Sequence, residues 1–273
     1  MAICAMMCGF DTWSEITLFA QEREPWFRRW LSLPGGIPSH DTFNRIFATL
    51  PPASLKSIFQ AWIGDIMGDD KLVGQLAVDG KALRATAKGR GANAVHMVNV
   101  WSTELGMCVG QQKVADKSNE ITAIPELLQL LELKGCLVSI DAMGTQVKIA
   151  DTILKKSGDY LLAVKDNQPS LNTEVKEQFQ AYWDKNETDV SGHGFTEQFD
   201  SEHGRKEHRR CWVLMVDESM PVCQQWKAKT IIAVQAERIE NGKGYDFVRF
   251  YISSRALDAT SALKATRAHW SVE

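Results

Sequence analysis

Apolar residues recur at helical spacing along the first quarter of the chain. Trp13, Ile16 and Phe19 share one helical face, and Ser39 stands before a second such stretch as a typical helix start. A Pro-Gly-Gly turn and a proline pair separate these stretches. The pattern predicts a small helical subdomain over residues 1–68.

The pattern changes near residue 71, where short apolar runs typical of strands begin. Three runs predict a strand meander, and helices then alternate with two further buried strands. This order predicts an α/β fold, a mixed sheet flanked by helices, and it is the order of a ribonuclease H-like core. The strands are expected over 72–80, 94–103, 107–115, 136–143 and 160–165, and the helices over 120–132 and 146–156.

A second set of strand-like pieces follows the fifth strand. A helix over 171–184 precedes four β-rich pieces, and a final helix is expected over 259–273. We therefore expect a ribonuclease H-like core formed by residues 71–165 and 258–273. A helix and a β-rich insertion over 166–257 interrupt it.

Composition excludes several classes of protein. The 273 residues are 44% hydrophobic and 24% charged, which is typical of globular proteins and not of fibrous or disordered ones. No apolar run approaches the roughly 18 residues that a membrane span needs. The apolar opening MAICAMMCGF has no basic residue before it, so we interpret it as part of a helix and not as a signal peptide. Six cysteines without a CxxC pair predict reduced thiols in a cytoplasmic protein.

Charge and missing motifs narrow the classes of function. With 31 basic and 34 acidic residues the net charge is −3, which excludes a uniformly cationic coat and leaves room for local basic patches. The sequence contains no GxxxxGK[ST], GxGxxG, GxSxG or HExxH motif. The sequence therefore lacks the main signals of enzymes that bind nucleotide cofactors and of serine hydrolases.

Two aspartates stand where buried strands are expected to end. Asp79 ends the run LAVD, and Asp141 ends the run LVSID. A carboxylate at such a position is costly unless it is paired, hydrogen-bonded or bound to a metal, and the ligands of α/β sheets gather at strand ends. Two structural alternatives stay open: Asp79 belongs to a hairpin turn, or Asp141 caps the helix that follows.

Basic residues cluster in two stretches. Lys81 and Arg84 lie in a ten-residue stretch with four basic and no acidic residues, and a second cluster spans His203–Arg210. Strand spacing in the second cluster predicts that Arg205 and Arg209 share a face. These stretches are either solvated loops or surfaces that contact the phosphates of nucleic acid.

Several segments together resemble a known family. The segments LPGGIPSHDTFNRIF, AVDGKALR, SIDAMGTQ, AVKDNQPSL, His203-Gly204-Arg205 and RAHWSVE are similar to those of the ISAs1 family of insertion-sequence transposases, within the IS4-like group. More narrowly, they resemble its H-repeat-associated members, along essentially the whole chain. The resemblance implies an Asp-Asp-Glu triad that falls on Asp79, Asp141 and Glu273. It also implies Mg²⁺ as cofactor, with Mn²⁺ as a substitute, for cleavage of DNA at element ends and strand transfer.

The resemblance also implies residues that bind DNA, and partners. His269 takes the place of an arginine in the motif that precedes the glutamate. The expected partners are the terminal repeats of the element and target DNA, held by a homodimer in a synaptic complex. The DNA contacts expected from resemblance and charge are Lys81, Arg84, Lys165, Asn167, Gln168, His203, Arg205, Arg209 and His269.

The two ends of the chain bear on its activity. The chain opens within an expected helix and stops on Glu273, the residue that would complete the triad. We expect a chain truncated at both ends, whose last carboxylate is poorly held, so that cleavage is lost or impaired. Two alternatives are a DNA-binding remnant without catalysis and a ribonuclease H-like nuclease that acts on RNA or hybrids.

Overall fold

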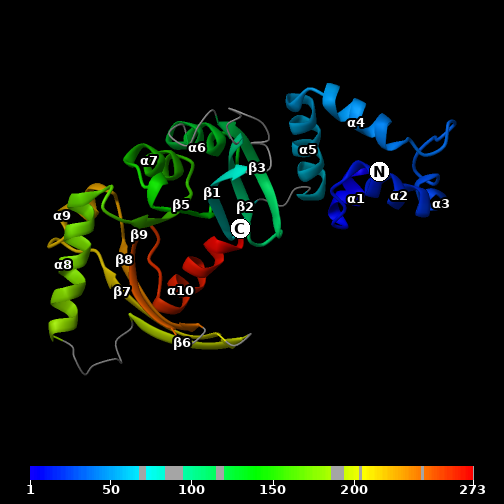
Figure 1. The fold of residues 1–273 in the computed structure, drawn as a ribbon. Helices are drawn as coiled ribbons and strands as arrows, with labels where there is room; N and C mark the ends of the chain where they lie inside the picture. Colours follow the sequence, from blue (N-terminus) through cyan, green and yellow to red (C-terminus); the bar gives the residue numbers. More distant parts are fainter. Residues whose placement is uncertain are drawn as a thin grey trace, which may run out of the picture. The chain divides into compact units, whose positions relative to one another are not determined.

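The chain divides into two compact units, Met1–Ile66 and Met67–Glu273. Figure 1 colours them along the sequence in a computed structural model. It describes residues 1–67, 72–83, 95–114, 120–185, 194–202, 205–240 and 243–272.

The first unit is helical, as the spacing of its apolar residues predicts. Thr12 caps α2 (Trp13–Glu22) and Ser39 caps α4 (His40–Thr49), each by accepting a hydrogen bond from a backbone N–H in the first turn. The apolar faces of the helices meet in a small core that includes Ala5, Ile16 and Phe43. The helices are α1 (Ala2–Met7), α2 (Trp13–Glu22), α3 (Glu24–Phe27), α4 (His40–Thr49) and α5 (Pro52–Met67).

A nine-stranded mixed sheet forms the centre of the second unit, within the part of the chain that the structure describes. β1, β4 and β5 run parallel to one another, and every other neighbouring pair is antiparallel. The order and directions of the first five strands are those of a ribonuclease H-like core, which confirms the predicted fold class. In spatial order the strands are β3 (Met107–Val114), β2 (Val95–Ser102), β1 (Gln75–Leu83), β4 (Leu137–Ile140), β5 (Asp159–Val164), β9 (Lys243–Ser253), β8 (Thr230–Glu240), β7 (Arg205–Met215) and β6 (Phe195–Glu202).

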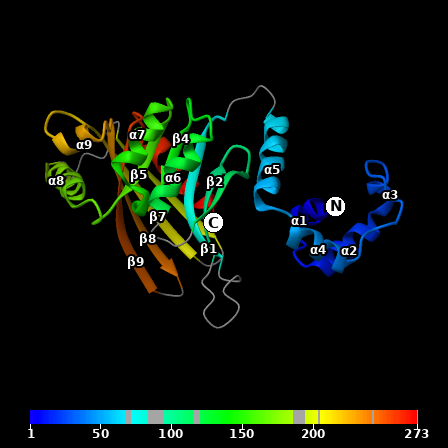
Figure 2. The same cartoon turned by 90° about the horizontal axis from the view of Figure 1, so that it is seen from above.

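Helices cover both faces of this sheet (Figures 1 and 2). α6 (Glu120–Gln129) and α7 (Val147–Lys155) pack together on one face, and α10 (Ala259–Ala268) continues into η4 (His269–Val272) on the other. Alternation along β1 distinguishes the faces. Gln75, at the start of β1, donates a hydrogen bond to a backbone carbonyl of α10, whereas Gly80, on the opposite face, lies against Glu120 at the start of α6.

The strands of the predicted insertion continue the same sheet. β9 pairs with β5, with Leu162 opposite Ile252, and α8 (Pro169–Lys185) and α9 (Pro221–Gln225) pack beside this part of the unit. Leu263 of α10 is buried in one cluster with side chains from β4, β5, β7, β8 and β9. The hydrophobic core therefore holds α10 across the junction between the two groups of strands. Among the described residues, none of the helices has the length and apolar character that crossing a membrane requires.

Candidate functional site

Asp79 and Asp141 stand side by side at one edge of the parallel strands. β1 and β4 pair with Val78 opposite Ile140, and each aspartate is the next residue along its chain. Because the strands are parallel, their carboxyl ends meet at the same edge of the sheet. The two residues that the sequence singled out separately are thus neighbours in space.

Both aspartates face the side of the sheet on which α10 and η4 pack. Gln75, four residues before Asp79, donates to a carbonyl of α10, and Ser139, two residues before Asp141, contacts a side chain of η4. Side chains alternate between faces along a strand, and the backbone at Asp141 is still extended. The carboxylates therefore lie on the face where the chain returns after the last strand.

Hydrogen bonds hold the loop that follows Asp141. One oxygen of this carboxylate accepts the N–H of Gly144 at 3.2 Å and caps η3 (Ala142–Gly144), the structural alternative that the sequence left open. Asn167 and Gln168, in the loop after β5, donate to backbone carbonyls at the two ends of η3, at 2.7 and 2.9 Å. These two amides, predicted as DNA contacts, hold the backbone beside the carboxylate.

Asn99 of β2 lies directly opposite Asp79 in the antiparallel ladder. The side chains of such a pair share a face, so Asn99 is next to the aspartates. Its Oδ1 atom is buried and has no hydrogen-bond partner within the residues that the structure describes. A buried acceptor of this kind is where a bound cation or water is expected. The sequence did not single out Asn99, because the pairing of β1 with β2 brings it to the site.

A cavity of about 210 Å³ opens beside Asp141. Its wall includes three residues that the sequence predicted to be functional, namely Asp141, Lys165 and His269. Arg249 of β9, which the sequence analysis missed, also lines it. Its permanent cations, Lys165, Lys176 and Arg249, outnumber its carboxylates, Asp141 and Asp166, which suits an anionic ligand.

A second cavity, of about 510 Å³, shares part of its wall with the first. Arg249, Tyr251 and Trp270 line both. The Arg249 guanidinium lies over the Trp270 ring, 5.1 Å from its centroid, as a cation–π pair. Burial raises the pKa of the Tyr251 phenol, with the Arg249 guanidinium opposing this effect, so Tyr251 presents a neutral hydroxyl. The arginines that line this second cavity, called the arginine groove below, are Arg209, Arg238, Arg249 and Arg267.

Carboxylates hold part of the arginine groove in place. Arg209 forms ion pairs with Asp200 and with Glu207, the second at 2.6 Å. Arg267 lies 3.2 Å from the same Asp200 carboxylate. These pairs fix the guanidinium groups at the wall, and the role of Arg209 as a DNA contact stays a prediction.

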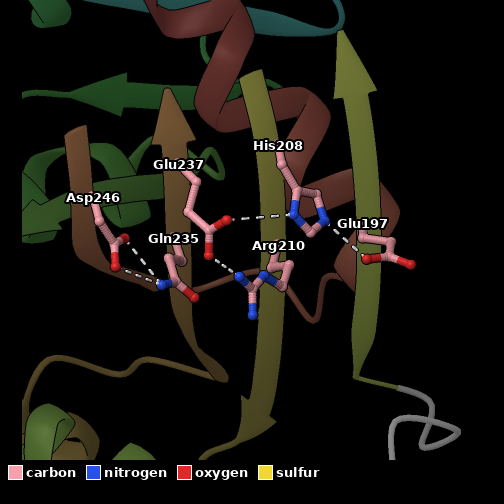
Figure 3. A network of polar contacts seen from close by, with 6 residues as sticks. All are labelled: Glu197, His208, Arg210, Gln235, Glu237 and Asp246. Atoms are coloured by element: carbon pink, nitrogen blue, oxygen red, sulfur yellow. Dashed lines mark hydrogen bonds and ion pairs between the residues drawn. The ribbon is translucent and has the colours of Figure 1, made fainter. Parts of the chain in front are cut away.

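Strand alternation divides the basic stretch of β7 between two faces. His208 and Arg210 point away from the face of Arg209, and Figure 3 shows them beside Glu197 and Glu237. His208 Nε2 lies 2.9 Å from Glu197 Oε2, and Arg210 pairs with Glu237. Carboxylates therefore pair with the basic side chains on both faces of β7, and Arg209 is on the face that lines the groove.

The remaining predicted residues differ in how far the structure describes them. Lys81 is exposed on β1, two residues after the first aspartate and on the same face. Arg84, His203 and Glu273 lie outside the described residues, and Arg205 begins β7 with a side chain that is likewise outside them. Within the described ranges, no group of three carboxylate, histidine or cysteine side chains is placed to hold a metal.

A row of buried, hydrogen-bonded side chains links β1, β4 and η4. Gln75 Nε2 donates to Ser139 Oγ at 2.8 Å, and Ser139 Oγ lies 3.1 Å from His269 Nδ1. The three residues are 7%, 1% and 7% exposed. His269 thus anchors η4 on the sheet, whatever else it contacts. The sequence does not predict these hydrogen bonds, because they join residues that are 64 and 130 positions apart.

Comparison with known proteins covers both units. The family model described as "Transposase DDE domain" matches residues 74–273, and the one described as "DDE_Tnp_1-associated" matches residues 1–63. Over 281 residues the chain is 38% identical to "H repeat-associated putative transposase YhhI" of Escherichia coli (strain K12), which covers 100% of this chain and 73% of that protein.

A second relative and one solved structure extend the comparison. The chain is 36% identical over 259 residues to "Uncharacterized protein in dhlA 3'region" of Xanthobacter autotrophicus, with 94% of this chain and 86% of that protein covered. The structure of a piggyBac transposase synaptic complex with hairpin DNA aligns with a TM-score of 0.42 and 10% identity. That alignment covers 94% of this chain and 55% of the other, and it is too distant to assign a function.

Proposed function

Because the chain belongs to the family of transposases with a DDE domain, we propose that it cuts DNA at the ends of a mobile element and joins them to target DNA. Asp79, Asp141 and Glu273 are the proposed catalytic residues. The observation that carries the proposal is the parallel register of β1 and β4, in which the two aspartates follow paired residues. Glu273 rests on the family resemblance.

The donor atoms at this edge fit a hard divalent cation. Asp79 and Asp141 offer carboxylate oxygens, and Asn99 adds a buried amide oxygen that lacks a donor among the described residues. Mg²⁺ and Mn²⁺ prefer such oxygen ligands. Bound between these side chains, Mg²⁺ would neutralise charge that develops on the scissile phosphate.

The proposed chemistry has two steps at phosphorus. In the first, the oxygen of water forms a bond to the phosphorus at the element end and the P–O3′ bond breaks; the leaving 3′-oxygen takes a proton from the water, so the nicked strand carries a 3′-hydroxyl on one side of the nick and a 5′-phosphate on the other. In the second, that 3′-hydroxyl attacks a phosphodiester of the target and displaces its 3′-oxygen. Lys165 and Arg249, in the cavity wall beside Asp141, stabilise the negative charge of the phosphate in both steps.

The proposed DNA path starts at this cavity and continues along the arginine groove. Lys81 lies on the same face of β1 as the aspartates, and Arg249 borders both cavities. The proposed partners are the terminal repeats and target DNA in the cytoplasm, bound by a homodimer that brings two ends together. The full set of proposed contacts from the sequence is Lys81, Arg84, Lys165, Asn167, Gln168, His203, Arg205, Arg209 and His269.

A nicking assay tests the proposal. The 273-residue chain is incubated with Mg²⁺ or Mn²⁺ and a supercoiled plasmid that carries the DNA flanking its coding sequence. Nicked and linear products, at a full or a reduced rate, should require the metal. The variants Asp79→Asn and Asp141→Asn should reduce them to background, because an amide cannot replace the charge of a carboxylate at a cation.

The matched control is Asp184→Asn, an exposed carboxylate exchange on α8, which should cleave like the unaltered chain. Metal-dependent nicking that survives both site variants would overturn the catalytic assignment. Binding of the plasmid without any cleavage would select a DNA-binding protein instead. Cleavage of an RNA–DNA hybrid but not of duplex DNA would select a ribonuclease.

A further inference from the structure

The hydrogen bonds from Gln75 through Ser139 to His269 have a direction, which follows from which of their atoms can donate and which can accept. Gln75 Nε2 lies 2.8 Å from the Ala265 carbonyl oxygen and 2.8 Å from Ser139 Oγ. A backbone carbonyl only accepts hydrogen bonds, so the Gln75 atom beside it is the amide nitrogen. This contact establishes the orientation of the Gln75 side chain.

The same reasoning passes through Ser139 to His269. An amide nitrogen only donates, so Ser139 Oγ accepts from Gln75. The Ser139 hydroxyl then has its single hydrogen left, and among the described residues its other partner is His269 Nδ1, at 3.1 Å. Nδ1 must therefore accept, because a proton on it would leave the buried hydroxyl without an acceptor. In a neutral imidazole the proton is then on Nε2.

We propose that Gln75 and Ser139 are positioning residues that hold His269 as the neutral Nε2–H tautomer and fix η4 on the strands that carry Asp79 and Asp141. This makes the imidazole a directed hydrogen-bond donor at the wall of the cavity next to Asp141. Its role toward DNA rests on the proposed function, in which the donor serves a phosphate oxygen of the bound strand. The tautomer itself does not depend on that function.

The buried position of the three side chains supports this assignment. Each is at least nine-tenths buried, so water does not compete for the bonds. Their backbones belong to three elements, β1, β4 and η4, and Gln75 also bonds α10 through Ala265. These hydrogen bonds set the tautomer and the ring orientation of His269. Hydrogen bonds to the second ring nitrogen do the same for a histidine that ligates a metal.

A two-bond ¹H–¹⁵N correlation spectrum of the ¹⁵N-labelled chain tests the tautomer without any DNA or metal. We expect the His269 signals, assigned with His269→Asn, to report an unprotonated Nδ1 and a protonated Nε2. Ser139→Ala removes the hydroxyl from which Nδ1 accepts, so nothing at Nδ1 then selects the Nε2–H tautomer. The Nδ1 signal should then move toward the protonated position. The matched exchange Ser170→Ala, exposed on α8, should leave the spectrum unchanged.

Binding to a fluorescent DNA duplex gives the second readout. A neutral donor releases no counterion, so His269→Ala should weaken binding by roughly two- to twelvefold while the salt dependence of the affinity stays the same. Ser139→Ala should slow plasmid nicking by about 10- to 100-fold and weaken DNA binding no more than His269→Ala does, and Ser139→Thr, which keeps the hydroxyl, should restore the rate.

The outcomes separate the inference from the proposed function. A protonated Nδ1 in the unaltered chain overturns the tautomer, and a spectrum that Ser139→Ala leaves unchanged overturns the positioning role, whether or not the chain binds DNA. A salt dependence that falls by about one charge in His269→Ala overturns the neutral donor. The expected tautomer in a chain that shows no nicking keeps the positioning role and defeats the proposed cleavage.

Discussion

Asn99 keeps a buried amide oxygen without a donor among the described residues, directly across from Asp79. Such an atom costs about 1–3 kcal/mol, which a side chain of similar volume without polar atoms avoids. We expect Asn99→Leu to raise the free energy of unfolding of the metal-free chain by about 1 kcal/mol, measured by urea denaturation. Asn167→Leu, which removes a bonded amide of the same size, should lower it. A lower urea midpoint for Asn99→Leu would contradict the prediction.

The cysteines differ in exposure, and this predicts their reactivity. All six are free thiols, as the sequence predicts; Cys8 is exposed, whereas Cys211 and Cys223 are fully buried. Burial raises the pKa of Cys211 to about 12, and the thiolate is the reactive form. At about pH 8 we expect iodoacetamide to label Cys8 well before Cys211 and Cys223, measured by mass spectrometry of peptides. Labelling in urea, the control, should reach all six, and early labelling of Cys211 in the folded chain would refute the burial.

The helix α10 depends on Asp258 for its start. The Asp258 carboxylate accepts hydrogen bonds from the N–H and the hydroxyl of Ser261, each at 2.8 Å. These bonds, the backbone one first, lower the pKa of Asp258 below 3.8. Because the folded pKa lies below the unfolded one, the cap stabilises the protein above that value and loses this effect as the pH falls through the folded pKa.

We therefore expect Asp258→Ala to cost about 1 kcal/mol at neutral pH and Asp258→Ser to cost less. Thermal unfolding at pH 7 and at about pH 3 measures the difference, which should shrink at the lower pH. An Asp258→Ala penalty of equal size at both values would mean that the carboxylate charge does not act as the cap.

The loop after β5 carries two kinds of predicted DNA contact. Lys165 is exposed and charged, whereas Gln168 donates to the backbone at the end of η3. We expect Lys165→Ala to weaken DNA binding and to lower the salt slope by about 1. Gln168→Leu should leave the slope unchanged and slow plasmid nicking, because it loosens the backbone next to Asp141. Fluorescence anisotropy at several salt concentrations and the nicking assay measure both effects. Weaker binding with normal nicking in Gln168→Leu would instead make it a direct contact.

Local patterns predicted much of the arrangement of elements. Helical spacing and the Ser39 cap indicated the first unit, and apolar runs that end in Asp79 and Asp141 indicated two strands with their carboxylates at one edge. The place of β9 next to β5 could not be predicted, since strand pairing over such a separation depends on packing in three dimensions. For the same reason the sequence did not single out Gln75 or Asn99, whose partners come from other elements.

With a net charge of −3, a DNA surface needs a local excess of cations, and the two cavities of the second unit supply one. Arg249 borders both cavities there. We expect Arg249→Ala to weaken binding to duplexes of any sequence and to lower the salt slope by about 1. Lys148→Ala, an exposed charge on α7 across the sheet, is the matched control and should leave both quantities unchanged. Equal losses in the two variants would indicate diffuse attraction and not a defined groove.

The bond between Gln75 and the Ala265 carbonyl joins residues 190 positions apart. A ribosome that adds about 5–20 residues per second needs roughly 10–40 seconds to bridge that interval. Both β1 and β4 have been synthesised once Ile140 is added, but the helix that walls their common edge has not yet been made. The aspartate edge is therefore completed only after α10 has been synthesised, so a nascent chain that ends before α10 lacks the proposed site.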